Sequence, residues 1–181
     1  MTLFPQRLSS MVYADHLEFD YIETYSLLRG LEYETQLKSI QKEYNLLEVR
    51  LKKRNNLSES ELKRHTELNG QVAGLQYLLN PQGQFHFSSI KTHTFKTGSA
   101  EVARLTTILK TEIKEVPFWM CSPIYRDAIV FYNSSHEIVS VLNVCLSCNR
   151  LHTLQTGQID ADDHCYHLLK QFFTEIGHEV E

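Results

Sequence analysis

The stretch Ile138-Val-Ser-Val-Leu-Asn-Val-Cys145-Leu-Ser-Cys148 decides how the C-terminal part of this chain folds. Most of its first residues are β-branched or aliphatic, a composition typical of a buried strand. Residues 127–133 have the same character, and the polar sequence Ser134-Ser-His136 separates the two runs. The pattern therefore predicts a β-hairpin made of residues 124–133 and 137–145.

Four cysteines can gather at the open end of this hairpin. If the turn centres near residue 135, opposed residues have numbers that sum to about 270, which brings Cys121 close to Cys148. Cys165 lies in the first turn of a predicted last helix, just after Asp162. If that helix packs across the end of the hairpin, Cys165 can join Cys145 and the other two cysteines.

A C-x-x-C pair at a strand end, with more ligands at a helix start, fits a tetrahedral zinc site. The arrangement resembles in part the treble-clef zinc fold, in which a knuckle is followed by a helix N-terminus. The predicted metal ligands are Cys121, Cys145, Cys148 and Cys165. The nearby spare nitrogen ligands are His152, His164 and His167. Ordinary buried thiols and a disulfide or redox pair are the alternatives to zinc.

Cys165 is also the best candidate for a catalytic thiol. A cysteine nucleophile needs a lowered pKa and a histidine base, and His164 and His167 stand beside Cys165 in the sequence. The acidic pair Asp162-Asp163 disfavours the thiolate. The chain contains no P-loop, dinucleotide-binding glycine motif, zinc-protease motif or hydrolase serine motif. A small metal- or thiol-dependent hydrolase with its site near Cys165 and His167 is therefore the alternative to a non-catalytic protein.

The N-terminal half shows a helical repeat in two segments. Apolar residues recur at spacings of four and three along residues 33–51, and the rhythm resumes along residues 61–79. Ser58 stands three residues before Glu61, which predicts a capping box at the start of the second helix. Two matched seams joined by a short polar loop predict a coiled-coil-like antiparallel helical hairpin over residues 20–80.

The expected fold class is α+β. Residues 1–19 have no clear period and are expected to form an irregular lead-in, followed by the helical hairpin over residues 20–80. Residues 81–181 are expected to form a compact α+β unit that holds the cysteines. That unit should contain a small antiparallel β-sheet with flanking helices. The expected strand covers residues 84–97. One helix is expected to start at the cap Ser99 and to run to about Lys114, and the last helix is expected to be capped by Asp160 or Asp162 and to run to Ile176.

The charge of the chain is unevenly distributed. The net charge is −4, but residues 41–114 hold 12 Lys and Arg against 7 Asp and Glu. The cations near the predicted tip of the hairpin are Arg50, Lys52, Lys53, Arg54, Lys63 and Arg64. They permit a nucleic-acid partner. Because glutamates are interspersed and no aromatic side chain stacks there, a solvated tip is favoured.

The N-terminal residues 1–10 have no apolar core of the kind that a signal peptide needs, and no apolar run is long enough to cross a bilayer. We therefore expect a cytoplasmic protein without membrane contact. The expected function is that of a non-catalytic interaction or adaptor protein. Its helical hairpin would make contact with a protein partner or with a second copy. A structural zinc would stabilise the α+β unit if the cysteines bind metal.

Overall fold

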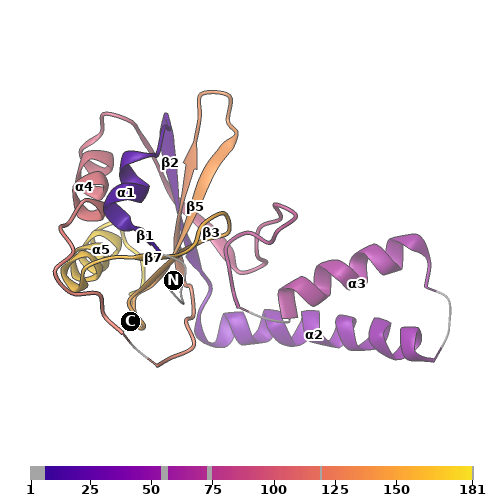
Figure 1. The fold of residues 1–181 in the computed structure, drawn as a ribbon. Helices are drawn as coiled ribbons and strands as arrows, with labels where there is room; N and C mark the ends of the chain where they lie inside the picture. Colours follow the sequence, from indigo (N-terminus) through magenta and orange to yellow (C-terminus); the bar gives the residue numbers. More distant parts are fainter. Residues whose placement is uncertain (1–6, 54–56, 73–74, 119, 181) are drawn as a thin grey trace, which may run out of the picture. The chain divides into compact units, whose positions relative to one another are not determined.

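The protein consists of two compact units. The computed structural model describes residues 7–53, 57–72, 75–118 and 120–180. One unit spans Leu28–Ser89 and is called the helical unit. The other combines Met1–Leu27 with Ile90–Glu181 and is called the sheet unit. In Figure 1 the chain leaves strand β2, runs through helices α2 and α3, and returns to strand β3.

The sheet unit is built on a mixed β-sheet. Over the described residues the sheet has seven strands in the order β1-β7-β6-β5-β4-β2-β3. The pair β1–β7 is parallel, whereas β2–β4, β4–β5, β5–β6 and β6–β7 are antiparallel. The strands are β1 (Leu8–Ser9), β2 (Tyr21–Leu27), β3 (Ser89–Lys96), β4 (Asp127–Tyr132), β5 (Ile138–Cys145), β6 (Arg150–Thr153) and β7 (Gly157–Asp160).

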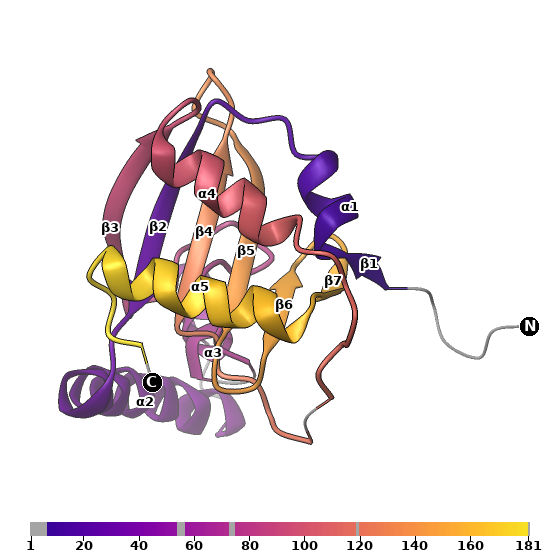
Figure 2. The same cartoon turned by 90° about the vertical axis from the view of Figure 1, so that its left-hand side faces the viewer.

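Helices cover one face of this sheet. Figure 2 shows α4 (Ala100–Leu109) and α5 (Asp163–Glu175) lying across it, with α1 (Ser10–Asp15) beside them. Both α4 and α5 begin at side-chain caps. Ser99 accepts a hydrogen bond from the Val102 amide, and Asp162 accepts one from the His164 amide. Apolar residues of the sheet and helices form one core, which includes Ile22, Ile129, Phe131, Leu142, Leu105, Leu109, Leu169, Phe172 and Phe173.

The predicted β-hairpin is confirmed as β4 and β5. Val130 pairs with Val141 and Ala128 with Asn143, so opposed residue numbers sum to one more than the predicted 270. The register shifts between Phe131 and Tyr132. The last helix is confirmed as α5, and of the two candidate caps Asp160 and Asp162 the structure has Asp162. The helix expected from Ser99 is confirmed as α4, although it ends at Leu109 rather than Lys114.

The helical unit holds α2 (Gly30–Lys52) and α3 (Glu59–Val72), which have a small apolar cluster of their own. The buried members are Leu47, Leu57 and Leu68, and Ile40 and Tyr44 pack against them. Such a cluster is small, so polar contacts between the helices matter for this unit.

The α+β class is confirmed, but the architecture predicted for it is wrong. The sheet of the described residues has seven strands and is mixed, so it is neither small nor purely antiparallel. Residues 20–80 do not form the predicted coiled-coil-like hairpin, because residues 21–27 are strand β2 and α3 ends at Val72. In residues 75–88 the structure shows an isolated bridge between Leu79 and Phe85 instead of more helix.

Two segments differ from the structure predicted for them. Tyr21-Ile-Glu-Thr-Tyr-Ser-Leu27 is rich in β-branched and aromatic residues, and it buries Ile22 and Thr24. The lead-in contains β1 and α1. Further along the sheet, β6 and β7 follow one another closely, because Gly157 (φ 75°) allows a tight turn between them. The helices of the described residues include none that is long and apolar enough to cross a bilayer.

Candidate functional site

The structure joins two of the four cysteines. Cys121 and Cys148 form a disulfide with a Cα–Cα distance of 6.3 Å, so the predicted approach of these two residues is confirmed. Cys145 and Cys165 are free and buried. The Cys145 sulfur accepts a hydrogen bond from the Ile124 amide at 3.3 Å. The connection before β4 is therefore held against the end of β5 at two points.

The cysteines do not make a metal site in this arrangement. Across the described ranges, no group of three or more His, Cys, Asp or Glu side chains is placed to hold a metal ion. Disulfide formation uses the sulfurs of Cys121 and Cys148, which would otherwise be thiolate ligands. Zinc binding by Cys121, Cys145, Cys148 and Cys165 stays a prediction, which metal analysis of the reduced protein tests.

The proposed catalytic thiol is in the wrong environment for a nucleophile. Cys165 is fully buried in the core. Burial, together with the Asp162 carboxylate, raises its pKa to about 12, so the thiol stays protonated at neutral pH. His167 is exposed and lines a surface pocket of about 180 Å³ with Asn149, Asp163 and other residues. Cys165 is not among the residues that line this pocket.

A buried polar network in the sheet unit was not predicted. His178 follows α5, and its Nδ1 lies 2.8 Å from Asp127 Oδ1, while its Nε2 lies 2.8 Å from Thr92 Oγ1. Thr92 in turn contacts the hydroxyl and the carbonyl oxygen of Thr24 at 2.7 and 3.0 Å. The network therefore ties the C-terminal segment to three neighbouring strands, β2, β3 and β4.

The carboxylate–imidazole–hydroxyl order of this network matches the order of groups that activates a serine nucleophile. Burial argues against such a role here. The His178 side chain has no exposed surface and that of Asp127 is 3% exposed. The Thr92 hydroxyl is also engaged by Thr24. We interpret these residues as a structural anchor, because a substrate has no surface from which to reach the imidazole.

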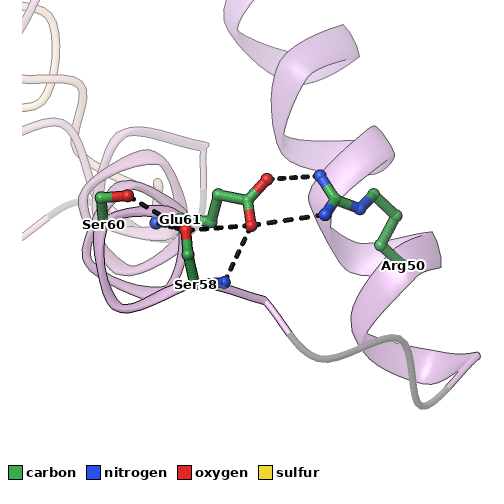
Figure 3. Close-up of polar contacts among 4 residues, drawn as sticks. All are labelled: Arg50, Ser58, Ser60 and Glu61. Atoms are coloured by element: carbon green, nitrogen blue, oxygen red, sulfur yellow. Dashed lines mark hydrogen bonds and ion pairs between the residues drawn. The ribbon is translucent and has the colours of Figure 1, made fainter.

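Polar contacts join α2 to α3 in the helical unit. The predicted capping box is confirmed: Glu61 Oε2 accepts from the Ser58 amide at 2.8 Å and Ser58 Oγ from the Glu61 amide at 3.3 Å. Figure 3 shows that Arg50 of α2 reaches the same glutamate. Arg64 of α3 makes two hydrogen bonds of 2.8 Å to Glu43 of α2. One carboxylate thus caps α3 and links it to α2.

These contacts neutralise much of the predicted basic tip. Arg50 and Arg64 are paired with glutamates of the other helix, and Lys52 is paired with Glu48 at 3.0 Å. Arg54 lies outside the described residues. Paired cations attract phosphates weakly because their charge is already balanced. The tip is therefore a poor candidate for a nucleic-acid interface.

The side of α2 opposite to the residues that pack with α3 carries an exposed stripe. Leu46 is 61% exposed and Val49 is 49% exposed. They line a shallow depression of about 440 Å³ whose other residues are Lys38, Gln41, Lys42 and Asn45. All six residues come from α2. We call this surface the α2 stripe.

The α2 stripe is not evident from the heptad rhythm of the sequence. The seam residues Ile40, Tyr44 and Leu47 lie on one side of α2, where they pack with α3. Positions 38, 42, 46 and 49 fall about half a turn away from that seam. Two apolar residues among lysines on that side are a detectable but weak signal.

Comparison with known proteins adds no assignment: no family model, no curated protein and no solved structure matches the chain.

Proposed function

We propose that this chain is a non-catalytic partner-binding protein and that the helical unit carries the recognition surface. The observation that supports this most directly is the place of the unit in the chain. β2 and β3 are neighbours in the sheet, yet residues 28–88 separate them and supply no strand to the sheet in their described part. Even parallel neighbours need a connection of only about a dozen residues. The long excursion therefore serves a purpose other than closing the sheet.

The α2 stripe is the surface that suits this purpose. Lys38, Lys42, Leu46 and Val49 follow one another at helical spacing, so they present a continuous row. Substantially exposed aliphatic side chains beside a depression are what an amphipathic helix buries when it docks. Each of the two apolar residues still has about half its surface or more to lose to a partner.

Charge indicates which partner fits. Within the described residues, Lys38 and Lys42 make no ion pair, so both charges are available to a ligand. An antiparallel contact with the α2 stripe of a second copy, centred on the row, would place Lys38 against Val49 and Lys42 against Leu46. Burying lysine charges against apolar side chains costs binding energy. We propose an acidic amphipathic helix of a partner protein, with apolar residues for Leu46 and Val49 and carboxylates for the lysines.

A labelled synthetic amphipathic peptide with leucines on one face and flanking glutamates provides a direct probe. Fluorescence anisotropy should show binding that weakens as salt rises. Leu46→Glu should weaken it about tenfold, because a leucine that loses most of its exposed surface contributes roughly 1.5 kcal/mol. Leu62→Glu, at a leucine of α3 that is 45% exposed, is the charge-matched control and should bind as the wild type does.

Two further arms separate this proposal from its rivals. A peptide with lysines in place of the glutamates should not bind. A double-stranded DNA oligonucleotide should bind the wild type no more tightly than it binds the Lys38→Glu variant. Equal binding of the acidic and basic peptides, or unchanged binding by Leu46→Glu, would show that the α2 stripe is not the recognition surface. Location in the cytoplasm stays a prediction; the Cys121–Cys148 disulfide is more typical of oxidising compartments.

A further inference from the structure

The two edges of the sheet differ in how they are closed. β1 has two residues and leads directly into α1, so little backbone is left unpaired at that edge. β3 has eight residues, Ser89–Lys96, and β2 is its only strand neighbour within the described ranges. About half of the peptide groups of an edge strand point away from the sheet and can pair with another strand.

The middle of the β3 edge lacks the usual protection by charge, although Lys96 is exposed at its end. Edge strands are commonly guarded by lysines that project freely. Lys91 stands in the middle of β3, but its Nζ lies 3.0 Å from Glu23 Oε1 of β2. Burial raises the pKa of Glu23, but hydrogen bonds from Tyr25 and Lys91 lower it more, so the carboxylate stays ionised and the pair persists. Ile90, beside it, is 48% exposed.

Other side-chain contacts hold β3 in its extended form. Thr92 is hydrogen-bonded to Thr24 of β2 and to His178. The rings of His93 and Phe95 are stacked with centroids 5.5 Å apart. β3 is therefore already extended, so it loses little conformational entropy when another strand pairs with it.

We propose that β3 is a dimerisation edge that pairs antiparallel with β3 of a second copy. A two-fold axis at His93 keeps each face of the sheet continuous across the dimer. Thr92 then lies opposite Thr94 of the second copy, and Ile90 opposite Lys96. Lys91 lies opposite Phe95, so no lysine faces a lysine, and the threonine pair and the aromatic contact are favourable cross-strand pairs.

The test uses the full chain in analytical ultracentrifugation over a concentration series. The wild type should form a dimer with a dissociation constant of about 10 μM or tighter. Ile90→Lys places a lysine opposite Lys96 of the second copy and should weaken the dimer at least tenfold. Val12→Lys, at a residue of α1 that is 40% exposed, is the matched control and should leave the dimer unchanged.

A cysteine variant tests the register independently. His93→Cys should form an intermolecular disulfide under mild oxidation, because residue 93 faces itself across the two-fold axis. Thr107→Cys, exposed on α4, should not. A wild type that stays monomeric, a dimer indifferent to Ile90→Lys, or equal cross-linking of both cysteine variants would each overturn the proposal. Because β3 lies outside the α2 stripe, these outcomes are independent of peptide binding.

Discussion

Removing the carboxylate of Asp127 should destabilise the sheet unit far more than removing an exposed one. In Asp127→Ala the His178 imidazole stays buried and loses the partner 2.8 Å from its Nδ1. Removing one partner of a buried hydrogen bond leaves the other polar group unsatisfied, which costs about 1–3 kcal/mol. For a chain of this size that corresponds to a fall in Tm of roughly 2–12 °C.

Urea unfolding followed by far-UV circular dichroism measures this loss. Asp163→Ala is the matched control, since its carboxylate makes an exposed hydrogen bond to Asn149 and its loss should change stability by about 0.5 kcal/mol or less. His178→Ala and the double variant complete a thermodynamic cycle, whose coupling energy should be about 2 kcal/mol. A loss below about 1 kcal/mol in Asp127→Ala, or additive single variants, would refute the anchoring role.

Three further predictions concern the disulfide, the buried Cys165 thiol and the cap of α3. Cys121→Ser should lower stability by about 3.5 kcal/mol, because the bridge closes a loop with a separation of 27 residues; a urea midpoint equal to that of the wild type would contradict this. The urea midpoint should fall as pH rises from about 9 to 12, because burial raises the pKa of Cys165 to about 12 and the unfolded chain loses its proton first. Cys165→Ala should make that dependence shallower, the remainder coming from buried tyrosines such as Tyr13 and Tyr166, whose pKa burial also raises. A profile unchanged by Cys165→Ala would disprove the contribution of the thiol. Ser58→Ala should cost about 1 kcal/mol, measured by amide exchange in α3, whereas protection equal to wild type would argue against the capping box.

Local signals predicted the local structure well. The β4–β5 hairpin, the N-caps Ser99 and Asp162, and the Ser58–Glu61 capping box each depend on residues close together in the sequence. The contact of Cys121 with Cys148 followed from extending the hairpin register. These predictions succeeded because strand pairing and capping are decided within a few residues.

Arrangements between distant segments could not be predicted in the same way. β2 is paired with β4, about a hundred residues later in the chain. Because helical spacing begins soon after β2, the first helix is predicted to start near residue 20, whereas α2 starts at Gly30. Asp127 and His178 are 51 residues apart, and neither is part of a motif. The cysteine pattern could not decide between zinc and a disulfide, because both require the same proximity of sulfurs.

The central claim is that the α2 stripe recognises an acidic helix, and a charge-swap measurement tests it most directly. Lys38→Glu/Lys42→Glu should lose affinity for the acidic amphipathic peptide and gain affinity for the peptide with lysines in place of glutamates, each by about tenfold. Loss of acidic-peptide binding without gain for the basic one, or no change for either peptide, would contradict the claim.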